Sequence, residues 1–491
     1  MNRRALPMAV VTALAAALAG CMVSPEYQRP QATATGLPKA FSGGGVTNAG
    51  EWKVAGVAVP LRGAAWWELF GDAELTRLVT LAEENNQQLA ESAARFAEAR
   101  AFINVARADY FPHLNGNSAF NRQRTSRNVF DNGGPAGVSH TFNNFNLALD
   151  ASWEVDLWGR VRRQVEGARA KLHAADDDMA AARLAIQSEV ATDYFTLRSL
   201  DAELSLLRQT VEAYQRSLEL TRNRRKGGIA TDLDVSQAET QLKSTEAQIP
   251  AIELQTARLR HALAVLCGQP ATGFAPATAG AATNAVLEVP VALPSELLER
   301  RPDIAAAERR MAAANADVGV AQTAFYPRVV FHGLAGFQSL SASTWFDWPS
   351  RVWAIGPSLE VPLFTGGRNR AQLDAARAAY DATVADYRQT VLVAFQEVED
   401  QLAAQRLLAA ELAAEQAAME SARRTLEVAN NRYKSGLVTY LEVATAQSAA
   451  LDRERTVVRL QSERLTAQVA LVKALGGGWH SGSAAEAAAG R

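Results

Sequence analysis

Two very long stretches of the chain carry a helical pattern with hardly an interruption. Residues 368–475 contain no proline, and Gly436 is their only glycine. A helix interior loses about 3 kcal/mol for a proline and about 1 kcal/mol for a glycine, so this composition permits one long helix on each side of Gly436. The first of these helices, residues 368–435, would be roughly 100 Å long. The pattern therefore predicts a long helical hairpin with a glycine at its tip.

A second stretch has the same character. Residues 160–226 contain no proline and end at Gly227 and Gly228; a return segment then runs to about residue 266, with an expected kink at Pro250. Apolar side chains recur along the outgoing stretch at alternating spacings of four and three residues, the heptad pattern of coiled-coil packing. With one shift of phase, the pattern runs through Val161, Val165, Ala168, Leu172, Ala175, Met179, Ala182, Ile186, Val190, Tyr194, Leu197, Leu204, Leu207, Val211, Tyr214 and Leu218.

The periodicity changes from helical to alternating ahead of each hairpin. Every second residue from Phe145 to Leu157 is apolar, which over this length predicts a strand with one apolar and one polar face. A weaker strand is expected at residues 113–122. Before it, we expect one helix that is capped by Asp72 and continues to about residue 109.

The second half of the chain repeats the order of the first. A helix that opens at Pro302 precedes strands expected at residues 329–339 and 353–363, and the long hairpin then begins at Arg368. Each half therefore consists of a helix, two strands and a long helical hairpin. The matched segments are Tyr110-Phe111-Pro112 with Phe325-Tyr326-Pro327, Glu154-Val155-Asp156-Leu157 with Glu360-Val361-Pro362-Leu363, Gly159-Arg160 with Gly367-Arg368, and Asn223-Arg224-Arg225-Lys226-Gly227-Gly228 with Asn431-Arg432-Tyr433-Lys434-Ser435-Gly436.

These patterns divide the chain into consecutive segments, and the fold class is mainly α with strands of transmembrane length. The segments are a signal peptide (1–20), an N-terminal lipid-anchored arm (21–65), a first repeat (66–270, β-hairpin 112–158, tip near 227–232), a connecting segment (271–300), a second repeat (301–476, β-hairpin 328–364, tip near 435–440) and a tail expected to be flexible (477–491).

The N-terminus has the features of a bacterial lipoprotein signal. Arg3 and Arg4 precede an apolar run too short to cross a membrane, and Leu18-Ala19-Gly20 leads directly to Cys21. We expect Cys21 to become the first mature residue and to carry S-diacylglycerol and N-palmitate. An ordinary signal peptide with a chance cysteine is the alternative. Some lipoproteins have aspartate directly after the acylated cysteine, whereas this sequence has Met22. It resembles in this respect the default lipoprotein signal, which routes the protein to the outer membrane.

Composition argues against several function classes. A net charge of −2, with both signs mixed along the helices, gives no indication of nucleic-acid binding. Two cysteines cannot build a disulfide framework, and the six histidines show no metal-ligand spacing. No phosphate loop, nucleophile elbow or His-Glu metal helix occurs in the sequence, and we interpret Asp176-Asp177-Asp178 as a solvated helix face. We therefore expect neither an enzyme nor a bound cofactor or metal.

The four expected strands have the span of transmembrane β-strands, which is about ten residues. Four strands cannot close a barrel, and lipid does not tolerate open strand edges, so several copies must share one barrel. Two copies supply eight strands, whose side chains would fill the interior, whereas three copies supply twelve and leave a pore. The alternative is a soluble β-layer on a helical core, which leaves the export signal and the length of the hairpins without a purpose.

With these motifs, the sequence resembles the TolC-like outer-membrane efflux family, in its OprM-like lipoprotein branch. The resemblance rests on the lipobox at Cys21, the strand entries after Pro112 and Pro327, the Leu-Glu-Arg-Arg-Pro-Asp-Ile segment at 298–304, and both tips. It implies a lipid-anchored homotrimer of the outer membrane, with a twelve-stranded β-barrel continued by a long α-helical coiled-coil barrel in the periplasm. It also implies a periplasmic adaptor and an inner-membrane pump of the RND type as partners, and passive exit of small toxic solutes.

The resemblance also assigns roles to the tips. Matched through the tip glycines, an aperture acid falls on Glu442, and a linking pair falls on Tyr433 and Asp234. The family's second ring acid falls on Thr445 and its linking arginine on Val438, so this sequence departs from the pattern there. The alternative is that Glu442 and Asp234 only cap the helices after the tips. Adaptor docking is implied for Gly227, Gly228, Ile229, Thr231, Gly436, Leu437 and Thr439.

Two other functions compete with small-molecule efflux. An exit duct for secreted proteins or peptides (type I secretion) would use the same fold, and the lipoprotein start favours efflux over it. A structural coiled-coil tether across the periplasm would need no strands of membrane length.

Overall fold

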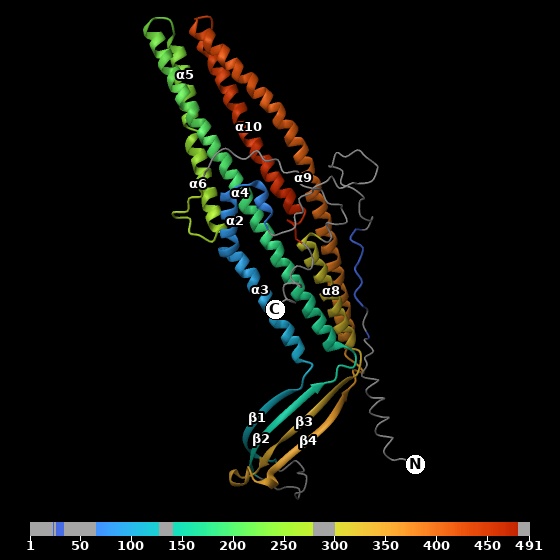
Figure 1. Cartoon of the computed structure of the whole chain (residues 1–491). Helices are drawn as coiled ribbons and strands as arrows, with labels where there is room; N and C mark the ends of the chain where they lie inside the picture. The colour runs from blue at the N-terminus through green and yellow to red at the C-terminus, as the bar shows by residue number, and fades with distance from the viewer. Residues whose placement is uncertain (1–22, 24–25, 34–64, 127–140, 278–299, 480–491) are drawn as a thin grey trace. The chain divides into compact units, whose positions relative to one another are not determined.

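The computed structural model describes residues 23, 26–33, 65–126, 141–277 and 300–479 (Figure 1). Its principal elements are α2 (Ala73–Asn85), α3 (Gln87–Ala108), β1 (His113–Arg124), β2 (Thr141–Glu154), α4 (Arg160–Lys226), α5 (Asp232–Glu246), α6 (Ile249–Leu266), α8 (Pro302–Thr323), β3 (Arg328–Ser339), β4 (Arg351–Glu360), α9 (Arg368–Lys434) and α10 (Tyr440–Ala474); a 3-10 turn, η1 (Trp66–Phe70), precedes α2.

The described chain forms two compact units, and each unit takes segments from both repeats. The first comprises the described residues within Met1–Pro30, Phe96–Ala175 and Ala307–Tyr387, and the second comprises those within Gln31–Arg95, Asp176–Ala306 and Arg388–Arg491. The long helices α4 and α9 each contribute to both units. The predicted arrangement of helix, two strands and helical hairpin, present twice, is confirmed.

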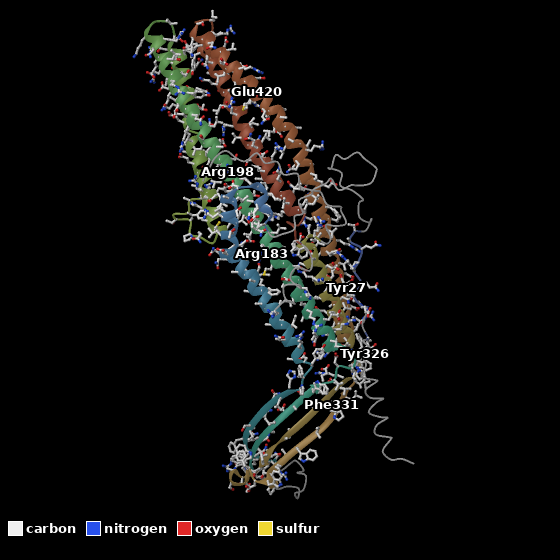
Figure 2. All side chains as sticks on the ribbon, viewed as in Figure 1. Tyr27, Arg183, Arg198, Tyr326, Phe331 and Glu420 are labelled. Atoms are coloured by element: carbon white, nitrogen blue, oxygen red, sulfur yellow. The ribbon has the colours of Figure 1, made fainter. Side chains whose placement is uncertain are left out.

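A four-stranded antiparallel sheet forms the centre of the first unit, in the order β1-β2-β3-β4. Trp153 of β2 lies opposite Phe331 of β3, with ring centroids 6.3 Å apart, and Figure 2 labels Phe331 on its strand. One face of the sheet carries most of the large apolar side chains, and many of these are exposed. Its large side chains are Leu114, Phe120, Leu147, Leu149, Trp153, Phe331, Trp353, Ile355 and Leu359.

The opposite face of the sheet is polar and makes its own hydrogen bonds. The Asn117 side chain donates to Asp150 across β1 and β2 at 2.7 Å, and the Gln338 side chain donates to Asn144 across β2 and β3 at 3.1 Å. The alternation predicted from the sequence thus produces a sheet with one polar and one apolar face.

Two of the strands, β2 and β4, end earlier than the alternation predicts. β2 stops at Glu154 rather than Leu157, because the carboxylate of Asp156 accepts hydrogen bonds from the N–H groups of Val161 and Arg162 and so caps α4. β4 stops at Glu360, two residues before Pro362, which has no N–H to donate to a strand ladder.

The predicted first helix is two helices, and the prediction of a single element over residues 72–109 is wrong. Asp72 caps α2 as expected, and its carboxylate also accepts a hydrogen bond from Arg198 of α4 at 2.6 Å. The break falls at Asn86. Its side-chain oxygen accepts from the N–H of Gln88, and its side-chain nitrogen donates to the carbonyl of Leu266 at 2.8 Å.

An apolar cluster lies in the second unit, where η1, α2, α4, α6 and α10 contribute buried side chains. Cys267 is fully buried there, and burial raises the pKa of its thiol to about 11. Large members of this cluster are Trp66, Trp67, Phe70, Leu75, Leu78, Tyr194, Phe195 and Leu263. The expected kink near Pro250 is a break at Ala247 and Gln248, and Pro250 lies in the first turn of α6, where its missing N–H costs nothing.

Arg301, in the Leu-Glu-Arg-Arg-Pro-Asp-Ile segment at 298–304, has a structural role in the second unit. Its buried guanidinium donates to Glu397 at 2.6 Å and to the carbonyl of Ala474 at 3.0 Å, and it forms an ion pair with Asp303 at 2.7 Å. It therefore holds the end of α10 beside the start of α8.

The two hairpins are duplicates without insertions. Both outgoing helices, α4 and α9, have 67 residues. The tip glycines Gly228 and Gly436 and the terminal glycines Gly268 and Gly476 all have positive φ, and each pair is separated by 208 positions. None of the helices in the described ranges contains a stretch long and apolar enough to cross a membrane.

Candidate functional site at the hairpin tips

Both tips reverse the chain through the same backbone motif. In the first tip, the N–H of Ile229 donates to the carbonyl of Arg224, and the N–H of Gly228 donates to that of Arg225, each at 2.9 Å. This is the hydrogen-bond pattern of a Schellman motif, whose turn residue needs a left-handed backbone. Gly228 has a φ of 74°, so the expected glycine turn is confirmed.

The second tip repeats this geometry. The N–H of Leu437 donates to the carbonyl of Arg432, and the N–H of Gly436 donates to that of Tyr433, again at 2.9 Å each. Gly436 has a φ of 75°. The duplication therefore extends to individual backbone hydrogen bonds.

Asp234 caps the return helix of the first tip. Its carboxylate accepts from the N–H and the hydroxyl of Thr231, both at 2.8 Å, while the Thr231 hydroxyl accepts from the N–H of Asp234 at 3.2 Å. Such a reciprocal capping box satisfies two N–H groups that a helix start otherwise leaves without partners. Asp234 therefore caps the return helix, and this cap leaves its aperture role untested.

The same carboxylate also joins the two tips. Its second oxygen accepts a hydrogen bond from the N–H of Tyr440, the first residue of α10, at 3.2 Å. Thr439, at the N-cap position of α10, makes no side-chain cap bond, so Asp234 from the other hairpin supplies one. Burial acts to raise the pKa of Asp234, but its hydrogen bonds from Thr231 and Tyr440 and the charge of Arg224 outweigh burial and lower the pKa.

Arg224 makes a second connection between the tips. Its guanidinium donates to the carbonyl of Lys434 at 2.8 Å and lies 4.9 Å from the ring centroid of Tyr433. The carbonyl is one that the end of α9 leaves without a helical partner, and the ring contact is a cation–π interaction. Sequence reasoning missed Arg224 as a site residue. It corresponds to Arg432 in the repeat, but its two contacts lie in the other hairpin, and local pattern does not report them.

Tyr433 and Tyr440 pack together between the two hairpins. Their rings lie edge to face, with centroids 5.4 Å apart, and both side chains are buried. The Tyr433 hydroxyl donates to Thr221 at 3.4 Å, and the Tyr440 hydroxyl lies 3.3 Å from that of Ser217. Burial raises the pKa of Tyr440, so its hydroxyl stays neutral at physiological pH.

The expected linking pair, Tyr433 and Asp234, is not joined directly. Within the described part of the chain, no hydrogen bond connects the two side chains. They are neighbours through Tyr440, whose ring touches Tyr433 and whose N–H binds Asp234. Their role in closing an aperture stays a prediction.

Glu442 lies in the first turn of α10, beside a shallow groove. Its carboxylate is 3.9 Å from the guanidinium of Arg432, and both side chains are more than half exposed. The groove has a volume of about 440 Å³ and runs along α9. Its lining residues are Ser421, Arg424, Thr425, Val428, Ala429, Arg432 and Glu442.

The ends of both tips expose large apolar side chains. Ile229 and Leu437, two of the expected docking residues, are exposed by 67% and 70%. Leu233 and Leu441 follow them on the return helices and are also exposed. Exposed apolar side chains of this kind at the end of a rigid hairpin suit a contact with another protein. Their docking role stays a prediction.

Two further expectations concern other parts of the chain. Cys21, the expected lipidation site, lies outside the described residues. Among the residues described, no group of three or more His, Cys, Asp or Glu side chains is placed to hold a metal ion.

Comparison with known proteins gives consistent matches over nearly the whole chain. The profile of a family described as "Outer membrane efflux protein" matches residues 78–269 and 293–477. The chain is 36% identical over 475 residues to the outer membrane protein OprJ of Pseudomonas aeruginosa, covering 96% of this chain and 95% of OprJ. It is 33% identical to the solvent efflux pump outer membrane protein SrpC of Pseudomonas putida, covering 98% and 99% of the two chains.

The fold is also similar to a solved structure. The outer-membrane channel OprN superposes with a TM-score of 0.83 at 30% sequence identity, covering 94% of this chain and all of that one. The duplicated strands and hairpins are therefore shared with a known channel along their full length.

Proposed function

The chain belongs to the outer membrane efflux protein family, and we propose that three copies of it form the exit duct of a tripartite efflux system. It is an outer-membrane efflux channel that adopts the TolC-like fold. The single observation that carries the proposal is that the family match includes both repeats, with their strands and both hairpins.

The sheet supports the trimer. Its apolar face is exposed in the single chain, and its edge strands β1 and β4 have no strand neighbour on their outer sides among the described residues. In lipid, every strand edge must be paired, so the four strands need the strands of further copies. Three copies give a twelve-stranded barrel with the apolar face toward lipid and the polar face toward a conducting interior.

The hairpins support a periplasmic tunnel that ends at the tips. Six hairpins from three copies would surround one channel as a coiled-coil barrel. A periplasmic adaptor would dock on Gly227, Gly228, Ile229, Thr231, Gly436, Leu437 and Thr439, and an inner-membrane RND-type pump would supply the energy. Tyr433, Asp234 and Glu442 would form the aperture, where three copies of Glu442 would attract cations.

The N-terminus supports anchoring of the mature protein in the membrane. Cys21 would carry S-diacylglycerol and N-palmitate. Residues 26–33 lie close behind it in the sequence, and Arg29 among them forms an ion pair with Glu308 of α8 at 3.1 Å. An arm fastened so near Cys21 would hold the lipid close to the first unit.

The exported solutes are proposed to be small toxic molecules. SrpC is named for solvent efflux, and the lipoprotein signal of this chain favours efflux over a protein-secretion duct. Deletion of the gene, followed by a toxicity screen across antibiotics, dyes, detergents and metal ions, should reveal sensitivity to one of these classes. Normal resistance together with retention of an exported polypeptide would instead support secretion.

Planar-bilayer recording of the purified full-length protein tests the channel itself. We expect discrete conductance steps, and native mass spectrometry of the same sample should give the mass of three chains. A coiled-coil tether would give no conductance. The Cys21→Ala variant, expressed with a cleavable signal, should conduct like the wild type, since the lipid anchors the duct and does not line it.

A further inference from the structure

Two helix edges in the second unit expose apolar and charged side chains that the single chain leaves uncovered. The α6 edge consists of Leu254, Arg258 and Val265, and the α9 edge consists of Val393, Asp400 and Leu407. The four apolar side chains are exposed by 52%, 70%, 38% and 55% in chain order. Arg258 has no ion-pair partner within the described ranges, and Asp400 accepts a hydrogen bond from Gln396, on its own helix.

We infer that the α6 edge of one copy packs antiparallel against the α9 edge of a second copy, with Arg258 opposite Asp400. The inference rests on the proposed trimer and specifies its subunit contact residue by residue. It follows from the duplication, because the chain already contains one example of the same contact.

That example is the packing of α10 against α4. The Arg455 guanidinium of α10 donates to Glu203 of α4 at 2.6 Å, and the Ser462 hydroxyl donates to the carbonyl of Phe195 at 3.3 Å. Moving forward along α10 therefore means moving back along α4. The return helix of the second hairpin thus packs on the outgoing helix of the first, in a defined antiparallel register.

The duplication converts this contact into one between copies. Each residue of α6 corresponds to the α10 residue 208 positions later, and each residue of α4 corresponds to the α9 residue 208 positions later. The offset holds from the tip glycines, Gly228 and Gly436, to Gly268 and Gly476, so no insertion shifts the register between them. The duplication therefore predicts a contact equivalent to α10–α4, in which α6 of one copy packs against α9 of another.

Applying the offset gives the facing residues. The counterpart of the Arg455–Glu203 contact places Ala247 of one copy opposite Glu411 of the next. Eleven residues further along α6, and eleven residues back along α9, Arg258 comes opposite Asp400. The arrangement thus brings Arg258, which has no ion-pair partner among the described residues, to the exposed Asp400.

The apolar residues agree with the same register. Val265, seven residues beyond Arg258, comes opposite Val393, seven residues before Asp400. Leu254 comes within one helical turn of Leu407. All four are exposed in the single chain, and the contact would cover them. Charge and apolar side chains therefore select one alignment of the two helices.

The two edges differ from each other, so the contact is head to tail. Such heterologous contacts close into a ring when the rotation per copy permits and otherwise extend into a filament. Since α10–α4 contacts within each copy alternate with α6–α9 contacts between copies, three copies would form a ring of six similar contacts. The pair Arg258–Asp400 then fixes the position of one copy relative to the next along the helix axes.

Cysteine cross-linking tests the register in the full-length protein. One chain carries Arg258→Cys, and a second, differently tagged chain carries Asp400→Cys; the two are expressed together and oxidised in membranes. We expect a disulfide-linked dimer that contains both tags. The native Cys267 is buried and should not compete. A matched control pairs Arg258→Cys with Glu411→Cys, which is displaced by about 16 Å along the helix.

A dimer formed as efficiently by the control pair, or none formed by the Arg258–Asp400 pair, would overturn the proposed register. Charge reversal provides an independent test that does not depend on cysteine chemistry. Arg258→Glu or Asp400→Arg alone should lead to loss of the trimer on native gels, and the double variant should restore it. A double variant no better than the singles would contradict the pairing.

The outcomes also separate this inference from the proposed function. A wild-type protein that is trimeric and conducts, but whose Arg258–Asp400 cysteine pair does not cross-link, keeps the channel and rejects the register. A wild-type protein that is monomeric and gives no conductance rejects the channel as well.

Discussion

The carboxylate of Asp234, at the start of one hairpin's return helix, accepts a hydrogen bond from the N–H of Tyr440, at the start of the other's, at 3.2 Å. One side chain thus caps two helices that lie more than 200 residues apart in the sequence. Arg224 of the first hairpin also donates a hydrogen bond to the carbonyl of Lys434 in the second. The two tips of a single chain therefore form one structure rather than two independent turns.

Replacing Tyr433 and Asp234 together by alanine should loosen the tips. The change removes the ring that Tyr440 packs on and the cap that both return helices share, and losing a helix cap costs about 1 kcal/mol. If these residues close the aperture, single-channel conductance in planar bilayers should rise. Asp232→Ala is the matched control, because Asp232 is an exposed acid in the same tip that forms an ion pair with Arg225 of its own hairpin. Unchanged conductance in the double variant would reject the aperture role.

Arg224→Lys should weaken the connection between the tips although it keeps the charge. Lysine cannot reproduce the planar guanidinium that reaches the Lys434 carbonyl while lying over the Tyr433 ring, and we expect the tip to lose about 1 kcal/mol of local stability. Hydrogen exchange of the amides at 432–440 should accelerate. Arg222→Lys is the control, because Arg222 is exposed and lies 3.6 Å from Glu239 of its own hairpin. Equal exchange in both variants would show that Arg224 does not hold the tips together.

Much of the fold was predictable because its signals are local. Heptad spacing and the absence of proline located α4 and α9, and the tip glycines marked the ends of both helices, since a left-handed turn residue is a property of the turn itself. Strand alternation identified the sheet for the same reason. The end of β2 was overestimated because the cap by Asp156 competes with the strand pattern.

Features that depend on distant partners were not predictable in this way. The break at Asn86 depends on the carbonyl of Leu266, 180 residues away, which no helical pattern contains. The tip connection through Arg224 depends on Lys434 of the other hairpin. At the candidate site, family resemblance drew attention to Asp234, but only the structure shows that it binds Tyr440 rather than Tyr433.

Gly436→Ala should destabilise the second tip by about 1 kcal/mol, because an L-residue at a φ of 75° is strained. The cost is conformational rather than steric, since an added Cβ would meet only the end of the Arg224 side chain, at 3.8 Å. Gly227→Ala is the matched control. Gly227 does not have a positive φ, and a Cβ there would meet its nearest atom at 3.6 Å, an ordinary contact. Hydrogen exchange at each tip should therefore increase for Gly436→Ala and stay the same for Gly227→Ala, and the reverse order would contradict the turn assignment.

Asp193 of α4 should make stability depend on pH in an unusual direction. Burial, reinforced by the like charge of Glu189, raises the pKa of Asp193 from its ordinary 3.8 to about 6. A carboxyl group whose pKa is higher in the folded state favours folding most when it is protonated, so its contribution is lost as the pH rises through about 6. Asp193→Asn should therefore stabilise the protein at pH 8, by at most about 2 kcal/mol because solvent screens this partly exposed carboxyl group, and change little at pH 4. Urea unfolding of the detergent-solubilised protein across this range provides the measurement. Glu189→Gln, which removes the neighbouring charge and keeps Asp193, should give a smaller shift in the same direction. If the free energy of unfolding of the wild type and of Asp193→Asn changed with pH in the same way, ionisation of the Asp193 carboxyl group would not destabilise the fold, and the prediction would be wrong.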